Sequence, residues 1–264
     1  DRLTGVLEQE ARALNPGFDK RMRSGLPYVR LKLAASLDGR TAMASGESRW
    51  ITSEAARRDV QWLRARSSAV ITGIDTVLAD DPSLNVRLGP AEIPALTPDE
   101  PVRQPLRVVV DSRLRMPGDA RMLPLPGATL VVTCSDSPRA IAQMTSAGAE
   151  VQRCPAAAGA RIDLRALMRY LGERELNEVL IETGPTLAGA AMQAGIVDEL
   201  VLYLAPHLMG DAARGLFRLP GLDRMADRLA LTITDVRQVG PDLRVTARPA
   251  GQGGEPGLEA PPVR

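Results

Sequence analysis

The sequence has few of the residues that build metal sites and disulfide frameworks. Its 264 residues include two cysteines, Cys134 and Cys154, and a single histidine, His207. These are too few for a zinc site of the usual Cys/His spacing, and too few for the disulfide scaffold of a small secreted protein. We therefore expect no metal and a cytoplasmic location.

Charge of one sign and long apolar runs are also lacking. The 33 basic and 32 acidic residues leave a formal net charge of +1, which gives no reason to expect a nucleic-acid partner. No window reaches the roughly 18 apolar residues of a membrane span, so we expect no membrane partner. No signal-peptide pattern follows the first residue. Because that residue is Asp1 rather than Met, we expect a piece of a longer protein.

What the sequence does contain is an alternation of strand and helix patterns. Apolar runs indicate strands over residues 27–36, 68–73, 106–112, 128–134, 149–154, 178–184 and 198–206. Helical spacing and N-cap residues indicate helices over residues 52–67, 137–148, 163–175 and 185–195. This order predicts an α/β fold: a mixed, mostly parallel sheet flanked by helices, with a C-terminal antiparallel hairpin over 229–249 that turns at Gly240-Pro241.

The two ends of the chain read differently from the middle. Residues 1–26 form a lead-in, with one helix that the sequence Asn-Pro-Gly at 15–17 should end. Residues 27–248 hold the alternating pattern and form the predicted domain. Residues 249–264 are rich in Pro and Gly, and we expect this tail to be disordered.

Polar residues stand at four strand ends. Ligands of open α/β sheets bind beyond the carboxyl ends of the strands, which nominates the segments after Ala35, Gly73, Val110 and Ile181. A carboxylate is costly to bury unpaired, so Glu182 should face a polar ligand or an arginine. The helix that follows it has free N–H groups at its start, which could hold a diphosphate. The alternative is an ordinary capped helix with small residues for packing.

The other strand ends each have two interpretations. Asp80 and Asp81, before a proline, could bind a ligand or only stop a helix. Arg87 could grip a phosphate as a fork or lie solvated at the surface. Asp111 and Ser112 could bind a ribose or a phosphate, or cap a turn. The sequence alone leaves these alternatives open.

Six motifs, taken in order, resemble one family. They are VRLKLAASLDGRTAMASGESRWIT, RRDVQWLRA, GIDTVLADDPSLNVR, RVVVDS, IETGPTLAGAAMQAGIVDEL and LAPHLMG. Together they are similar to the reductase domain of the bifunctional riboflavin-biosynthesis protein, which joins a pyrimidine deaminase to a 5-amino-6-(5-phosphoribosylamino)uracil reductase. The resemblance covers about residues 1 to 248. The lead-in resembles the end of the deaminase, whose His-Ala-Glu and Pro-Cys-x-x-Cys zinc elements are absent.

The resemblance implies a fold, an activity and a partner. The fold would be dihydrofolate-reductase-like. The activity would be the NADPH-dependent reduction of the ribosyl group of a phosphorylated aminopyrimidine to a ribityl group, with the hydride going to C1 of the open-chain imine form. The protein would form a homodimer.

The resemblance also implies residue roles. Ala34 and Trp50 would lie beside the nicotinamide of the cofactor, Thr76 and Asp80 would form hydrogen bonds with the cofactor, and Ser112 would lie near its adenosine. The diphosphate would be held at the start of the last predicted helix, by Gly184, Pro185, Thr186, Leu187, Ala188, Gly189 and Ala190. The substrate would contact Ser48, Arg64, Leu84, Arg87 and Glu182. Of these, Ser48, Arg64 and Arg87 would contact its phosphate. Proton transfer would fall to Lys32, Asp80 or Glu182, which the sequence does not rank. Lys32 lies two residues before Ala34, so both should point to one face of their strand.

Two rival functions stay open. The chain could be a nucleotide- or pterin-binding module without chemistry, or a pterin reductase on the same fold. Two arginines suited to phosphate favour the phosphorylated substrate over an uncharged pterin. The sequence does not settle NADPH against NADH, because no arginine is clearly placed for a 2′-phosphate.

Overall fold

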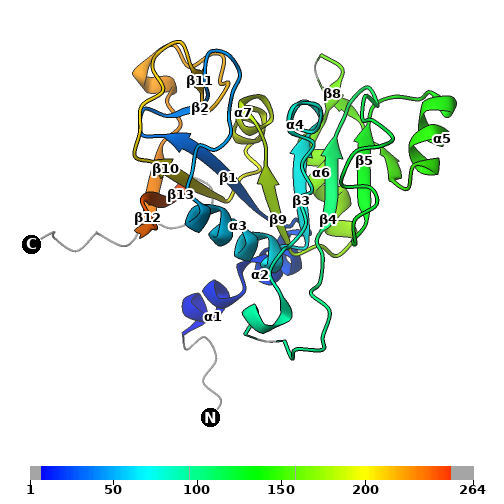
Figure 1. Cartoon of the computed structure of the whole chain (residues 1–264), viewed down its shortest axis with the longest axis horizontal. Helices are drawn as coiled ribbons and strands as arrows, with labels where there is room; N and C mark the ends of the chain where they lie inside the picture. Colours follow the sequence, from blue (N-terminus) through cyan, green and yellow to red (C-terminus); the bar gives the residue numbers. More distant parts are fainter. Residues whose placement is uncertain (1–6, 95, 158, 251–264) are drawn as a thin grey trace, which may run out of the picture.

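A nine-stranded mixed sheet organises the chain, in a computed structural model that describes residues 7–94, 96–157 and 159–250. The strand order is β12-β13-β10-β1-β9-β3-β4-β5-β6, and every neighbouring pair from β10 to β6 is parallel (Figure 1). The strands are β1 (Tyr28–Ser36), β3 (Ala69–Gly73), β4 (Leu106–Val110), β5 (Thr129–Thr133), β6 (Glu150–Arg153), β9 (Glu178–Glu182), β10 (Glu199–Ala205), β12 (Leu231–Val239) and β13 (Asp242–Pro249). The predicted fold class, a mixed and mostly parallel sheet, is confirmed.

The antiparallel hairpin is also confirmed. Val239 of β12 pairs with Asp242 of β13, so the turn consists of Gly240 and Pro241. Two small sheets lie outside the main one: β2 (Arg40–Ala42) pairs with β11 (Arg214–Gly215), and β7 (Ala156–Ala157) pairs with β8 (Arg161–Ile162).

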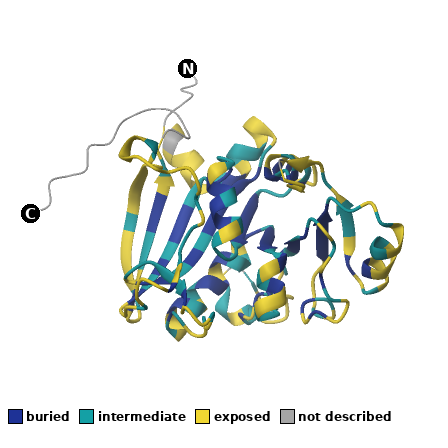
Figure 2. Ribbon diagram, turned by 90° about the horizontal axis from the view of Figure 1, so that it is seen from above, coloured by how far each residue is buried: buried dark blue, intermediate teal, exposed yellow. Residues whose placement is uncertain are grey.

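Helices cover both faces of the sheet, which is why its strands are near-continuous apolar runs. Successive residues of β9, Val179 and Leu180, enter two different buried clusters. The first cluster includes α6 (Leu164–Glu173) and α7 (Pro185–Gln193); the second includes α3 (Glu54–Arg66), α4 (Ile74–Asp80) and α5 (Pro138–Ser146). Two short 3₁₀ turns, η1 (Pro90–Glu92) and η2 (Met225–Asp227), complete the elements. The middle of the sheet is buried and its β12 edge is exposed (Figure 2).

The lead-in contains one helix more than predicted. It forms two helices, α1 (Glu8–Leu14) and α2 (Pro16–Ser24). The predicted end of the first helix at Asn-Pro-Gly is confirmed, but the same residues also start a second one. The Asn15 side chain accepts a hydrogen bond from the Phe18 N–H at 3.2 Å, and Pro16 occupies the first helical position, where it needs no N–H partner. The same three residues thus end α1 and begin α2.

The predicted disordered tail cannot be compared with the structure, because residues 251–264 lie outside the described residues. Strand β13 continues to Pro249, one residue past the predicted domain end. Within the described part of the chain, no helix has both the length and the apolar character to cross a membrane.

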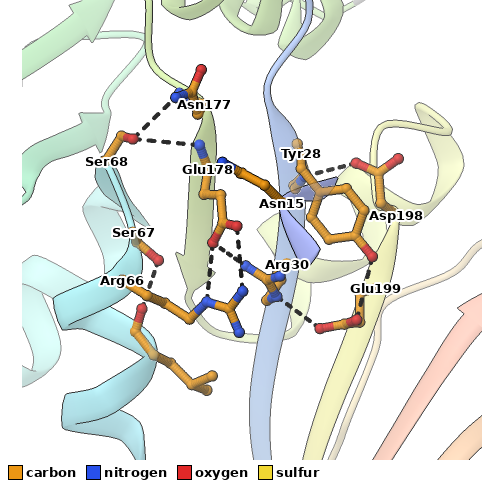
Figure 3. Close-up of polar contacts among 12 residues, drawn as sticks. Asn15, Tyr28, Arg30, Arg66, Ser67, Ser68, Asn177, Glu178, Asp198 and Glu199 are labelled. Atoms are coloured by element: carbon orange, nitrogen blue, oxygen red, sulfur yellow. Dashed lines mark hydrogen bonds and ion pairs between the residues drawn. The ribbon is translucent and has the colours of Figure 1, made fainter. Parts of the chain in front are cut away.

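A closed ion network joins the amino ends of the central strands (Figure 3). Arg30 of β1 is buried and pairs with Glu178 of β9 and with Glu199 of β10, the latter at 2.8 Å. Arg66, the last residue of α3, adds a second guanidinium to Glu178 at 3.2 Å. Burial, with the nearby Glu199 carboxylate, raises the pKa of Tyr28 to about 12, so its hydroxyl stays a donor to Glu199.

Candidate active site

The carboxyl ends of the central strands meet at one large cavity, which we call the long cleft. It has a volume of about 1310 Å³, and its lining includes Ala34, Gly73, Val110 and Glu182 from the ends of β1, β3, β4 and β9. A second cavity of about 330 Å³, the basic pocket, lies beside it and is lined by Trp50, Arg57 and Arg87 among others. Lys32, Ser48, Arg64, Asp80, Leu84 and Glu182 line both cavities. The structure therefore brings together all four strand ends nominated from the sequence.

A charged trio stands where the two cavities meet. Lys32 of β1 and Glu182 of β9 are register partners on neighbouring parallel strands. Arg64 of α3 lies across Glu182: its Nε and Nη2 donate to the two carboxylate oxygens at 2.6 and 3.0 Å. The expectation that Glu182 faces an arginine is met by this two-pronged pair, which is the strong geometry for a guanidinium and a carboxylate.

The trio has shifted acid strengths. Burial lowers the pKa of Lys32, and only the nearby Glu182 carboxylate opposes that effect. Burial alone would raise the pKa of Glu182, but Arg64, followed by Lys32 and Arg87, lowers it below its ordinary value. Glu182 is therefore held ionised, whereas Lys32 is made a stronger acid than an ordinary lysine.

Helix α7 begins at the long cleft, and its first turn is open to it. Gly184 is the N-cap, and a Cβ built there would meet only the Thr76 hydroxyl, at 3.9 Å. Gly184, Pro185, Thr186, Leu187 and Ala190 line the cleft.

Two members of the predicted diphosphate cradle do not line the cleft. Ala188 is fully buried in the first core cluster. A Cβ on Gly189 would lie 2.0 Å from the carbonyl oxygen of Arg218. Gly189 is small because the Arg218 backbone packs against it, and Ala188 faces the core, so both positions serve packing rather than the cleft.

In the turns after β4 and α4, one aspartate each has a structural role, as one of the two interpretations of the sequence predicted. Asp111 is fully buried and accepts hydrogen bonds from the N–H groups of Arg113 and Met116. Burial raises its pKa, against the effect of those donors. Asp81 is the left-handed C-cap of α4 and accepts from the Arg121 N–H at 2.8 Å. Asp111 and Asp81 therefore build turns at the edges of the cavities, Asp111 in the lining of the long cleft and Asp81 in that of the basic pocket. Their neighbours Ser112 and Asp80 also line the long cleft.

Trp50 and Ala34, the predicted neighbours of the nicotinamide, both line the basic pocket. Ala34 also lines the long cleft, whereas Trp50 does not. The Trp50 side chain is exposed, and Arg57 stacks on its ring, 4.4 Å from the centroid. The shared role beside the nicotinamide stays a prediction.

Comparison with known proteins agrees with this geometry. Residues 27–245 match the family described as RibD C-terminal domain. The chain belongs to this family. The riboflavin biosynthesis protein RibD of Escherichia coli K12 is 48% identical over 241 residues, which are 90% of this chain and 64% of that protein.

Two further proteins are similar to this chain. The solved structure of Acinetobacter baumannii RibD, form 1, has a TM-score of 0.81 at 42% identity and covers 93% of this chain and 64% of that one. A Buchnera aphidicola protein named 5-amino-6-(5-phosphoribosylamino)uracil reductase is 31% identical over 78% of this chain and 99% of its own length. The chain thus spans about 64% of the length of the RibD proteins it matches first.

Sequence reasoning missed several basic residues of this RibD C-terminal domain. Arg57 lines the basic pocket, and Arg113 and Arg161 line the long cleft beside Ser112, whose hydroxyl accepts from the Ile162 N–H at 3.3 Å. Arg57 could have been found, because it lies seven residues before Arg64 on one helix face. Arg161 could not, since only the fold brings β8 beside β4.

Proposed function

We propose that this chain is an NADPH-dependent reductase that converts the ribosyl group of 5-amino-6-(5-phosphoribosylamino)uracil to a ribityl group, a step of riboflavin biosynthesis. One observation carries the proposal: the long cleft and the basic pocket meet at Lys32, Glu182 and Arg64. A nicotinamide cofactor in the first cavity and an anionic substrate in the second would meet over these side chains. The name of the Buchnera relative supports the same reaction.

The residues of the long cleft suit a dinucleotide cofactor. The open backbone at Gly184 and the N-terminus of α7 would hold its diphosphate, because free N–H groups and the helix dipole favour anions. Thr76 and Asp80 lie one turn apart on α4 along the same cleft, and Ser112 lies at its β4 end. When bound, the cofactor supplies a hydride to C1 of the open-chain imine form of the substrate.

Arg113 and Arg161 support NADPH over NADH. Both line the cleft near Ser112: Arg113 follows it in the chain, and Arg161 precedes Ile162, whose N–H donates to the Ser112 hydroxyl. Neither arginine forms an ion pair with another described residue. Their charges would suit the 2′-phosphate that distinguishes the two cofactors, for which the sequence alone indicated no arginine.

The chain itself provides the proton. The imine nitrogen takes up a proton as C1 takes the hydride, and an effective donor has a pKa near the working pH. Among the three candidates, Lys32 fits best, because burial lowers its pKa while Arg64 keeps Glu182 ionised. Glu182 would hold the Lys32 ammonium and accept a hydrogen bond from the substrate. Asp80 is further out, at 3.5 Å from Arg49, and would contact the cofactor.

Turnover tests this function against the pterin alternative. We expect absorbance loss from NADPH when the phosphoribosylaminouracil is added, and none with a dihydropterin. NADH should be oxidised more slowly. An absence of substrate-dependent NADPH loss would refute the reductase proposal, and reduction of the pterin alone would favour the rival.

The homodimer and the cytoplasmic location stay predictions. Exposed apolar side chains on the β12–β13 hairpin support a second copy of the chain as partner; they are Leu231, Ile233, Val236 and Leu243.

A further inference from the structure

We propose that Arg57 and Arg87 form the clamp for the phosphate of the substrate, and that Arg64 positions Glu182 instead of binding the phosphate. This inference rests on the proposed function, because it names which side chains of the basic pocket recognise the substrate. It departs from the expectation drawn from the resemblance, which gave the phosphate to Arg64, Arg87 and Ser48 and assigned nothing to Arg57.

Arg64 is already engaged through all three of its nitrogens. Its Nε and Nη2 donate to the Glu182 carboxylate, and its Nη1 donates to the Asn85 carbonyl oxygen at 3.0 Å. Two of its five N–H groups make no hydrogen bond to another described residue, and these do not form the Nε–Nη2 fork. A phosphate that took Arg64 through that fork would displace Glu182, which would leave a buried carboxylate short of its main partner.

Ion pairing within the basic pocket shows which of its cations have no acidic partner among the described residues. Each of its acids has its own arginine: Glu182 has Arg64, Asp80 has Arg49 at 3.5 Å, and Asp81 has Arg121 at 3.8 Å. Three cations of the pocket remain without an acid among the described residues, and they are Lys32, Arg57 and Arg87. Lys32 stands at the junction with the long cleft, so Arg57 and Arg87 are the pair available to an anion within the pocket.

Arg57 is held ready for a ligand. Its guanidinium stacks on the Trp50 ring at 4.4 Å, and its Nη1 donates to the Thr52 carbonyl oxygen at 2.7 Å. Its Nε and Nη2 make no hydrogen bond to another described residue. Stacking on an aromatic face fixes the plane of the fork while leaving its edge free, which lowers the entropy lost when it binds.

Helix α3 brings the two arginines to the same pocket. Arg57, Gln61 and Arg64 are spaced by four and three residues, so they lie on one face of the helix. Gln61 is buried, and its Oε1 accepts the backbone N–H of Arg87 at 3.0 Å, which anchors the 87 segment to that face. The Arg57 charge acts on Arg87: burial first, then Arg64 and Arg57, lowers the Arg87 pKa. Two like charges in one pocket, neither of them in an ion pair with another described residue, suit a phosphate.

Substrate truncation tests the clamp. We would measure kcat and KM for wild type and Arg57→Gln with the phosphorylated substrate and with the same compound after phosphatase treatment. We expect the substitution to lower kcat/KM about 10- to 100-fold for the phosphorylated substrate, mainly through KM, because a charged hydrogen-bonding group is lost. With the dephosphorylated substrate the two proteins should differ by less than about twofold, since no phosphate remains to be held. The KM for NADPH should not change.

Arg58→Gln is the matched control, because Arg58 is exposed on the same helix and pairs with Glu92 outside the pocket. It should leave kcat/KM for the phosphorylated substrate unchanged. Arg57→Lys should lie between wild type and Arg57→Gln, since it keeps the charge but loses the fork. An equal loss with both substrates, or the same loss in Arg58→Gln, would overturn the clamp.

Calorimetry with inorganic phosphate separates this inference from the function on which it rests. We expect wild type and Arg58→Gln to bind phosphate alike and Arg57→Gln to bind it at least about tenfold more weakly. If wild type shows no turnover but phosphate binding depends on Arg57, the reductase proposal fails and the anion site stands. If wild type turns over and phosphate binding does not depend on Arg57, the clamp alone is refuted.

Discussion

Strands β1 and β9 carry two pairs of charged side chains on one face of the sheet. Arg30 and Glu178 stand near the amino ends of the two strands. Lys32, two residues further along β1, lies beside Glu182 at the carboxyl end of β9, and we call these two places the amino end and the carboxyl end. Helix α3 covers this face and adds an arginine to each acid, Arg66 to Glu178 and Arg64 to Glu182 (Figure 3 shows the amino end). The same three elements thus build two ion clusters from similar parts.

The two clusters differ in their charge balance and their access to solvent. At the amino end, Arg30 and Arg66 are matched by Glu178 and Glu199, and the network closes on itself. At the carboxyl end, Lys32 and Arg64 share Glu182, and both cavities open onto them. A complete set of partners makes a structural network. An incomplete set beside a cavity is what an anionic substrate can complete.

The cation type at each end follows the same division. Arginine does not lose its proton in proteins, so the permanent charges of Glu178 and Glu199 suit the buried Arg30. Lysine can release its proton when burial lowers its pKa, as burial does for Lys32. The central cation of the amino end cannot titrate, whereas that of the carboxyl end can. The predictions that follow from this comparison are given from the largest expected effect to the smallest.

Lys32→Met should produce the largest loss. It removes the proton donor proposed for the imine nitrogen while keeping a side chain of similar length. We expect kcat to fall about 100-fold or more, the usual size of a general-acid contribution. Affinity for NADPH should change little, because Lys32 stands at the junction of the cavities and not at α7. Steady-state kinetics and a cofactor titration would measure both.

The pH profile separates the proton of Lys32 from its charge. Because burial lowers the Lys32 pKa, the protonated fraction of Lys32 falls as pH rises through that lowered value. Activity should therefore decline on the alkaline side below the ordinary lysine pKa of 10.5. Lys32→Arg keeps a cation that cannot donate. It should therefore be as slow as Lys32→Met and lack that alkaline decline. Retention of the decline in Lys32→Arg would assign the titration to another group.

Glu178→Gln should cost stability instead of activity. It leaves the buried Arg30 with Glu199 as its one acidic partner and Arg66 with none among the described residues. Removing one partner of a buried ion pair costs about 3 kcal/mol of unfolding free energy. Urea unfolding would measure this loss, and kcat should stay near the wild-type value because Glu178 does not line either cavity.

Glu182→Gln is the matched variant at the other end. Its unfolding free energy should fall less than that of Glu178→Gln, because Lys32 can release its proton and the cavities admit water, while its kcat should fall strongly. Similar losses of unfolding free energy in the two variants would show that the two ends do not differ in charge balance and access to solvent.

The amino-acid pattern predicted the carboxyl end of the sheet better than the amino end. Apolar runs and helical spacing located the strands, and the rule that ligands bind beyond the carboxyl ends then grouped Glu182 and Gly184 near one cavity. Lys32 was added by the resemblance and by its alternation with Ala34 along the strand. The ion pairs of Arg30 and Glu178 were not predicted, because each residue lies in an ordinary strand and their pairing requires the register of β1 with β9 and β10. Long-range register is not encoded in local patterns.

Small residues show the same limit at single positions. Gly184 and Gly189 are equivalent in the sequence, as two glycines of one helix start. Only the fold reveals that Gly184 faces open space while Gly189 lies against the Arg218 backbone. The partner of Arg64 was foreseeable from chemistry alone, because Glu182 at a strand end required a cation. The contact between Arg57 and Trp50 was not foreseeable, because no helical or strand periodicity in the sequence relates Trp50 to α3.

Glycine substitutions should sharpen the contrast between a closed and an open edge. Gly172 of α6 lies at the amino edge, where a Cβ would be 1.9 Å from the Gly25 carbonyl oxygen, whereas Gly184 lies at the carboxyl edge with only Thr76 nearby, at 3.9 Å. We expect Gly172→Ala to lower the unfolding free energy by about 1–3 kcal/mol through overpacking, with the NADPH dissociation constant unchanged. Gly184→Val should weaken NADPH about tenfold, equal to about 1.4 kcal/mol, and leave stability near wild type.

Each variant of this pair serves as the control of the other, since both add atoms to a glycine near a helix end. The unfolding free energy and the NADPH dissociation constant should move separately: the first only in Gly172→Ala, the second only in Gly184→Val. Because Gly184 has a φ of −80°, which any residue adopts, a loss of cofactor affinity there cannot be attributed to backbone strain. Unchanged NADPH affinity in a folded Gly184→Val protein would mean that the cofactor does not approach α7, and the assignment of the diphosphate to this helix would have to be abandoned.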